Sequence, residues 1–166
     1  MKHWNSFFDP SLFEGVVKGT LVGLNSGAVK FGSTPAFCDV AMTLRGEYEE
    51  DLDKLETLIY DVANTIADVY DLEVQNLYSD IFPVTANDPE LADRADMAFA
   101  ELGDITELEK PMLWAEDFGR YSEVCKAYYF GVGSGEEAAE LHSDDYDWND
   151  LINWRAIEAL RMLTEL

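Results

Sequence analysis

The sequence predicts an α+β fold in the first half of the chain and an α/β arrangement in the second half. Strict alternation of apolar and other side chains over residues 38–45 predicts a strand. A helical apolar stripe over residues 52–69 follows it directly. A helix-start signal at residues 87–89 opens new patterns and places a boundary near residues 83–88. We therefore expect three parts: a lead-in (1–14), a first domain (15–85) and a second part (86–166).

The lead-in is rich in aromatic side chains but has no period, so it is predicted to be irregular. Residues 16–25 are prone to form a strand, and turn signals follow at residues 25–27 and 32–35. In the next strand Cys38, Val40, Met42 and Leu44 share one face, while Arg45 ends the more polar face. This strand is predicted to be half-buried.

A long helix follows, because the apolar stripe recurs every three or four residues. Its start carries acidic side chains, which favour the positive end of the helix dipole: Glu47, Glu49, Glu50 and Asp51. A further strand is predicted over residues 72–81, closed by Pro83. Strand, strand, helix and strand make up most of a split βαβ, or ferredoxin-like, antiparallel sheet, although the strand and helix expected before residue 15 are not visible.

The second part begins with a helix whose buried stripe is Leu91, Ala95, Phe99 and Leu102, with Gly103 as its stop. Residues 112–114 are predicted to form a short strand and residues 126–132 a better one. Because the better strand is apolar on both faces, it is expected to lie inside a covered sheet. A last helix, capped near Asn149, is expected from residue 150 to the end.

Composition excludes several classes of protein. The chain holds 34 Asp and Glu against 11 Lys and Arg, a formal net charge of −23, and it is 48% hydrophobic. The hydrophobic content supports a folded core, while binding to nucleic acid or to an anionic membrane surface would need clustered basic residues. No apolar run approaches the ~18–20 residues that span a bilayer. We expect a cytoplasmic protein in which Cys38 and Cys125 are buried thiols.

Three segments of the second part resemble, in order and spacing, the C-terminal end of the zinc-dependent amidohydrolases of the aminoacylase/carboxypeptidase (peptidase) family: 114–119, 127–133 and 141–147. Residues 31–35, 43–45 and 80–87 extend the resemblance to residues 15–166. It is closest to the amidohydrolase branch, which cleaves N-acyl amino acids and related amides. The resemblance implies that residues 15–85 are a lid (dimerisation) domain, partly ferredoxin-like, whose sheet forms a homodimer. Residues 86–166 would be the C-terminal part of an αβα catalytic domain.

The resemblance makes His142 a metal ligand, with zinc or manganese as the metal of the full-length parent. Taken alone, a histidine in an acidic loop is more often a solvated side chain. Glu140, Asp144, Asp145 and Asp147 surround it and could orient a ligating imidazole.

Three further residues are candidates for substrate binding. Arg45 ends its strand where the family carries an arginine that reaches a substrate carboxylate, a role that suits a planar guanidinium. The alternative is a surface arginine on a solvated sheet. Glu116 and Asp117 lie where the family borders its active-site cleft, although Asp117 could simply cap the next turn. No residue is assigned a catalytic role.

Several family features are absent from the sequence. These are the opening His-x-Asp or Cys-x-His pair, the paired glutamates, the lid asparagine (Gly32 here) and the lid histidine, since His3 lies in the lead-in. A catalytic zinc site needs about three protein ligands. We therefore expect a fragment of a metal-dependent amidohydrolase acting on N-acyl amino acids or peptides, inactive alone. The alternative is a stand-alone acidic module of ferredoxin-like type that binds a basic protein.

Overall fold

The computed structural model describes residues 4–103 and 105–165, which fall into two units. The first unit holds the chain up to Val84 together with Lys110–Asp117, and the second holds Thr85–Glu109 and the chain from Phe118 onward. The predicted α+β class is confirmed, because the chain forms helices and one two-stranded antiparallel sheet. His3 lies outside the described residues.

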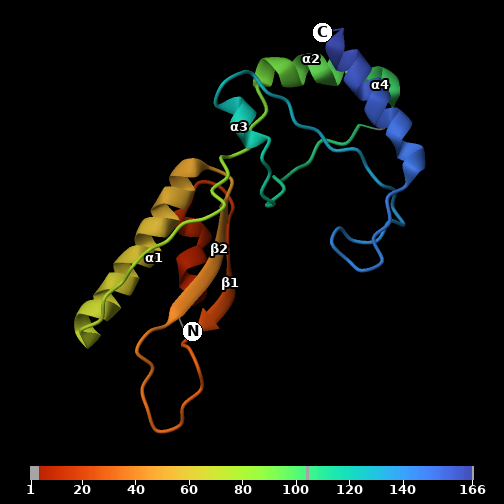
Figure 1. The fold of residues 1–166 in the computed structure, drawn as a ribbon. Helices are drawn as coiled ribbons and strands as arrows, with labels where there is room; N and C mark the ends of the chain where they lie inside the picture. Colours follow the sequence, from red (N-terminus) through yellow and green to blue (C-terminus); the bar gives the residue numbers. More distant parts are fainter. Residues whose placement is uncertain (1–3, 104, 166) are drawn as a thin grey trace. The chain divides into compact units, whose positions relative to one another are not determined.

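The sheet of the first unit is a hairpin of β1 (Val17–Asn25) and β2 (Asp39–Gly46), shown in Figure 1. Both strands lie where the sequence predicts them. In their antiparallel register Lys18 is opposite Arg45. The pairing is interrupted between Leu21 and Gly23, which leaves Val22 without an opposite residue and 66% exposed.

The lead-in is more ordered than predicted. It forms two short 3-10 helices, η1 (Trp4–Phe8) and η2 (Pro10–Leu12). Asp9 caps η2 by accepting a hydrogen bond from the Ser11 amide at 2.9 Å. The Phe8 ring covers Gly19 of β1 so closely that a Cβ there would come within 2.1 Å of the ring. Within the predicted lead-in the described residues thus form short turns, and one aromatic ring lies against the sheet.

The long helix α1 (Glu49–Tyr70) is confirmed, but its apolar stripe is covered at one end alone. Leu55 is fully buried, and Leu52 and Ile59 are half-buried. Further along, Val62, Ile66 and Val69 are 42%, 50% and 72% exposed. The stripe is therefore covered near the start of the helix and increasingly open toward its end, although Ala67 on a neighbouring face is buried. Asp71, a left-handed residue (φ 54°), ends the helix.

One buried carboxylate ties α1 to the chain that leads into β1. Asp51 is 5% exposed, and its two oxygens accept hydrogen bonds from the backbone N–H groups of Glu14 (3.1 Å) and Gly15 (2.7 Å). Lys54 donates to the Leu12 carbonyl one turn later, at 2.5 Å. Because both amides are satisfied by a charged acceptor, this contact is expected to be among the stronger ones of the first unit.

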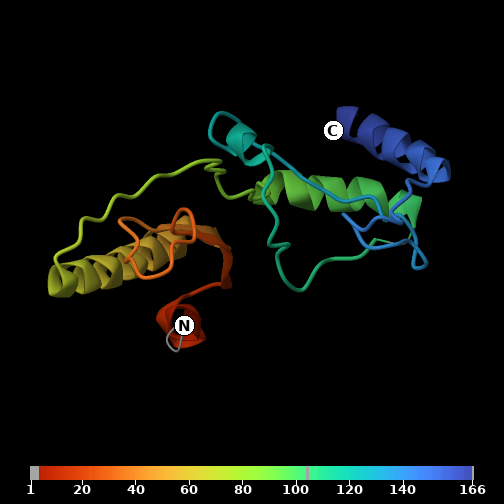
Figure 2. The same ribbon diagram turned by 60° about the horizontal axis from the view of Figure 1, so that its bottom comes forward.

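The strand predicted over residues 72–81 is not formed. This segment runs back along α1 in an extended conformation (Figures 1 and 2), but residues 73–80 make no backbone–backbone hydrogen bond within the described chain. The β-prone pattern is present, but no neighbouring backbone supplies the hydrogen-bond partners that define a strand.

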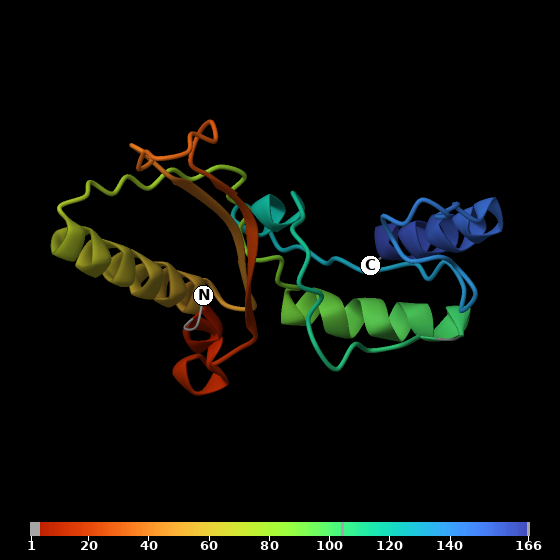
Figure 3. The ribbon, with the colours of Figure 1, turned by 90° about the horizontal axis from the view of Figure 1, so that it is seen from below.

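The second unit is built on two helices that lie side by side, α2 (Pro89–Phe99) and α4 (Asn153–Thr164), as Figures 1 and 3 show. The helix α2 begins at Pro89, where the sequence predicts a helix start, and Asp88 caps it by accepting from the Leu91 amide at 3.0 Å. The core between the helices consists of Ala95, Phe99 and Ala159. Three short helices complete the unit: η3 (Ala100–Leu102), α3 (Gly119–Ser122) and η4 (Asp150–Ile152), the last capped by Asn149.

The strands predicted over residues 112–114 and 126–132 are also wrong. Instead of a sheet, a side chain holds the second segment: Asn87 donates to the carbonyl of Tyr129 (2.9 Å) and accepts from its amide (2.6 Å). The Asp88 amide donates to the Ala127 carbonyl at 2.8 Å. The two bonds of Asn87 replace the pair of backbone hydrogen bonds that a neighbouring strand would make with Tyr129. Phe130 packs on Phe99, with ring centroids 5.2 Å apart. No covered sheet surrounds this segment among the described residues.

Cys38 and Cys125 are exposed, not buried, because Cys38 lies in the hairpin loop and Cys125 just after α3. Among residues 4–103 and 105–165, no helix has both the length and the apolar character to cross a membrane.

The chain exposes far more surface than a protein of its size usually does. Its accessible surface is 13550 Å² for a mass of 18.7 kDa. Even two separate compact units of half that mass would together expose about 10,000 Å². The excess includes many large apolar side chains, so each unit has faces that its own residues do not cover.

The Asp51 contact gives the first prediction. Asp51→Ala leaves the Glu14 and Gly15 amides without their acceptor, so the free energy of unfolding is expected to fall by about 3 kcal/mol. Denaturant unfolding measures this change. The matched control is Asp53→Ala, an exposed aspartate of the same helix, which is expected to stay within about 0.5 kcal/mol of the parent. Equal losses of unfolding free energy in the two variants would show that the hydrogen bonds of Asp51 do not stabilise the first unit specifically.

Candidate functional site

Arg45 is half-buried near the end of β2, and the fold gives its side chain a specific neighbour. Its Nη1 donates a hydrogen bond to the carbonyl oxygen of Leu113 at 2.5 Å. The two residues are 68 positions apart in sequence, and this bond joins β2 to the segment 110–117, which belongs to the first unit. A guanidinium has five donors, so one bond leaves others for a second acceptor.

Glu116 and Asp117 lie on the same segment, three and four residues after the contact with Arg45. Glu116 is half-buried and Asp117 is exposed. Neither carboxylate makes an ion pair or hydrogen bond with a described residue. The structure therefore brings Arg45 to the segment that carries both acids, without pairing the arginine to either of them.

His142 lies in a surface loop of the second unit. Its imidazole is exposed, and its backbone is left-handed with φ 71°, which few residues other than glycine adopt. A turn closes around it, in which the Ser143 amide donates to the Glu140 carbonyl at 3.0 Å. The side chain is thus open to a ligand and is not buried in an apolar interior.

The residues that the structure describes do not complete a metal centre. Within the described ranges no three His, Cys, Asp or Glu side chains come together as a group that could hold an ion. The acidic residues around His142 are all exposed and do not converge with it. Because a catalytic zinc ion takes about three protein ligands, His142 could supply one of them and the described residues do not supply the others.

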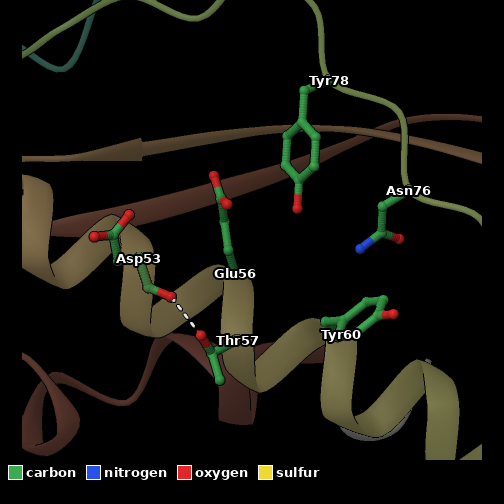
Figure 4. A pocket seen from close by; sticks show the side chains of 6 residues that line it. All are labelled: Asp53, Glu56, Thr57, Tyr60, Asn76 and Tyr78. Atoms are coloured by element: carbon green, nitrogen blue, oxygen red, sulfur yellow. Dashed lines mark hydrogen bonds between the residues drawn. The ribbon is translucent and has the colours of Figure 1, made fainter.

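A hollow of about 650 Å³ in the first unit was not found from the sequence. Four residues of α1 and two of the extended segment line it: Asp53, Glu56, Thr57, Tyr60, Asn76 and Tyr78. Figure 4 shows the Glu56 carboxylate and the Tyr78 hydroxyl pointing into the space, while Thr57 donates back to the Asp53 carbonyl at 2.9 Å. The spacing of Asp53, Glu56 and Tyr60 on one helix face was the available signal, but such a face usually only meets solvent.

A family model and individual relatives point to the same protein family. The model of Peptidase family M20/M25/M40 matches residues 6–162, nearly the whole chain. The chain is 25% identical over 119 residues to thermostable carboxypeptidase 2 and to thermostable carboxypeptidase 1 of Saccharolobus solfataricus. It is 25% identical over 116 residues to an uncharacterized hydrolase of Staphylococcus saprophyticus. No solved structure matches the chain.

These matches cover unequal shares of the proteins compared. They include 71% of this chain for each carboxypeptidase and 66% for the uncharacterized hydrolase. Each covers 30% of the relative, so the chain corresponds to less than a third of the length of these proteins.

The Arg45 contact gives a second prediction. Arg45→Met keeps the aliphatic stem but removes the donor, so the free energy of unfolding is expected to fall by about 1–2 kcal/mol. Amide hydrogens of residues 113–117 are expected to exchange faster in this variant. Lys18→Met is the matched control, because Lys18 lies opposite Arg45 in the register and is exposed. Unchanged exchange at residues 113–117 in Arg45→Met would show that the bond does not hold this segment.

Proposed function

Because this chain belongs to peptidase family M20/M25/M40, we propose that it is the lid and C-terminal part of a metal-dependent hydrolase of N-acyl amino acids or related peptides. The observation that carries the proposal is the family match over residues 6–162. In this proposal the hairpin and α1 belong to a ferredoxin-like lid, and the protein acts in the cytoplasm. The family is metal-dependent, and the metal proposed for the complete enzyme is zinc or manganese.

Arg45 is the proposed contact for a substrate carboxylate. Its position supports this role, since it is half-buried at a strand end and lies beside the segment with Glu116 and Asp117. A half-buried guanidinium binds a carboxylate more strongly than a fully solvated one, because less water competes. Glu116 and Asp117 would border the same site. If Arg45 has this role, chemical shifts of the first unit should respond to N-acetyl-leucine but not to N-acetyl-leucinamide, and the response should vanish in Arg45→Met.

His142 is the proposed metal ligand of this chain. Two observations support it: the imidazole is exposed, and its left-handed backbone costs about 1 kcal/mol, a kind of strain that is concentrated at functional sites. Because a set of three ligands is not assembled within the described residues, the remaining ligands would come from a polypeptide region outside this chain.

We propose further that the chain alone does not catalyse hydrolysis. A panel of N-acetyl and N-benzoyl amino acids, assayed with added zinc or manganese, is expected to give no turnover above that of the metal alone. His142→Ala is the matched control and is expected to give the same background. Turnover by the parent chain that His142→Ala abolishes would contradict the proposed inactivity.

The role of His142 has its own test, independent of activity. In a His3→Gln background one imidazole remains, and zinc titration followed by NMR is expected to shift its signals with weak affinity, as for a site short of ligands. His142→Gln in the same background should leave no imidazole signal and weaker zinc binding. Zinc binding that is unchanged in His142→Gln would rule out this residue as the ligand.

We also propose a homodimer through the outer edge of β1, whose backbone groups have no partner on that side among the described strands. Val22 and Leu24 are exposed along this strand. Sedimentation equilibrium is expected to give twice the chain mass of 18.7 kDa. Val22→Glu is expected to dissociate the dimer by like-charge repulsion, whereas Val29→Glu in the exposed hairpin loop is not. A monomeric parent chain would contradict the dimer.

A further inference from the structure

We infer that the second unit binds a small apolar carboxylate, such as a short-chain fatty acid, in a hollow between α2 and α4. Four residues line this Arg94 hollow: Leu91, Arg94, Tyr128 and Leu163. All four belong to the second unit. The inference uses no residue of the proposed substrate and metal sites, so either can fail without the other.

Two walls of the Arg94 hollow are built on the core of the second unit. Tyr128 and Leu163 both pack against the buried cluster between the helices. The Tyr128 ring lies 6.2 Å from the ring of Phe99, centroid to centroid, and its hydroxyl donates to the Asp96 carboxylate at 3.3 Å. These contacts fix the position of the aromatic wall, so the hollow is not formed by freely exposed side chains alone.

The other two walls come from α2. Leu91 and Arg94 are three residues apart on this helix and therefore lie on the same face of it. Both side chains are half-buried, as are Tyr128 and Leu163. An arginine in such a place covers apolar surface with its aliphatic stem, while its guanidinium meets polar groups. A guanidinium has five N–H donors, so it can bind a carboxylate in addition to a partner inside the protein.

The lining of the Arg94 hollow defines the class of ligand. Two leucines and a tyrosine ring give it apolar walls, and Arg94 supplies a permanent positive charge. None of its lining residues in the described part of the chain is Asp or Glu, although the chain holds 34 of these acids. An apolar group with one carboxylate matches both features, because a guanidinium binds two carboxylate oxygens through parallel hydrogen bonds. An alcohol would use the apolar walls alone, and an amine would meet the guanidinium with like charge.

The volume of the Arg94 hollow limits the size of the ligand. It is about 280 Å³, near the lower end of the ~300–1,000 Å³ of typical ligand sites. At the ~30 Å³ that one water molecule occupies in the liquid, this space holds roughly nine non-hydrogen atoms. A six-carbon carboxylate such as hexanoate therefore has the size that fits. A ligand this small makes few contacts, so its dissociation constant is expected in the millimolar range.

The net charge of −23 does not prevent an anion from binding in this hollow. At physiological ionic strength, exposed charges more than about 8 Å apart are largely screened, so the groups next to the ligand dominate. The Asp96 carboxylate accepts the hydrogen bond of the Tyr128 hydroxyl. The pKa of Tyr128 is raised, first by burial and then by this carboxylate. The phenol therefore stays neutral and adds no negative charge beside a bound anion.

A series of small molecules tests the chemistry of the ligand. Titration of the full chain with hexanoate is expected to move the amide chemical shifts of residues 91–94, 127–129 and 160–164. Three analogues are expected to bind at least about tenfold more weakly: 1-hexanol lacks the charge, hexylamine reverses it, and acetate lacks the apolar chain. Equal binding of any one of them, or no binding of hexanoate, would overturn the inference.

Substitution of Arg94 tests the polar anchor. Arg94→Met keeps the aliphatic stem and removes the guanidinium, so hexanoate is expected to bind at least about tenfold more weakly while the weak binding of 1-hexanol is unchanged. Arg120→Met is the matched control, because Arg120 is an exposed arginine of the same unit that does not line the hollow. Equal effects of the two substitutions on hexanoate binding would refute the role of Arg94.

Two further variants locate the bound carboxylate. Leu91→Phe fills the hollow without a change of charge, and hexanoate is expected to bind at least about tenfold more weakly. Binding that persists in this variant would place the ligand elsewhere and overturn the inference. Arg45→Met separates this site from the proposed substrate site, since the shifts of the second unit are expected to be unchanged in it. Shifts that are confined to the first unit and vanish in Arg45→Met would belong to the substrate site and would also overturn the inference.

Discussion

The first unit depends on one constraint: α1 is longer than its two-stranded sheet can cover. The helix is 22 residues long and presents an apolar stripe over residues 52–69, but the sheet that the described residues form has two strands. Where the helix meets β2 and the lead-in, Leu55 is fully buried and Asp51 is tied to the Glu14 and Gly15 amides. Toward its C-terminal end the same stripe becomes more exposed, at Val62, Ile66 and Val69. A helix and a sheet are stable only when each covers the apolar face of the other.

The second unit also has a small core and apolar side chains that its own residues do not cover. Its core is three buried side chains between α2 and α4, with a few partly buried neighbours. The segment 126–130 has the composition of an interior strand, but Asn87 supplies the bonds that a neighbouring strand would otherwise make. The two units thus retain local order while lacking covering layers. This agrees with a chain that spans 30% of its carboxypeptidase relatives.

Elements set by local sequence were predicted well. Alternation located β2, periodicity located α1, and the Asp88–Pro89 pair located the start of α2, because each depends on residues a few positions apart. The predictions over residues 72–81, 112–114 and 126–132 failed for a common reason. A strand exists only where a second backbone lies beside it, and the local pattern carries no information about that second backbone.

The candidate site shows the same division. The family resemblance identified the candidates Arg45, Glu116, Asp117 and His142. The bond from Arg45 to Leu113, however, joins residues 68 positions apart, so no local sequence pattern predicts it. The hollow above α1 also arises from distant segments. Conversely, the expectation that Cys38 is buried followed from general cysteine usage, and it was wrong because Cys38 precedes the strand, which begins at Asp39, and lies in an open loop.

The central claim is that α1 and the segment after it form an apolar layer that this chain covers only in part. Native-state amide hydrogen exchange of the free chain, residue by residue along α1, tests it most directly. The account predicts protection close to the global value over residues 52–59, a steady fall over residues 62–69, and almost none over residues 73–80. Uniform protection along the whole helix, continued through residues 73–80, would contradict it.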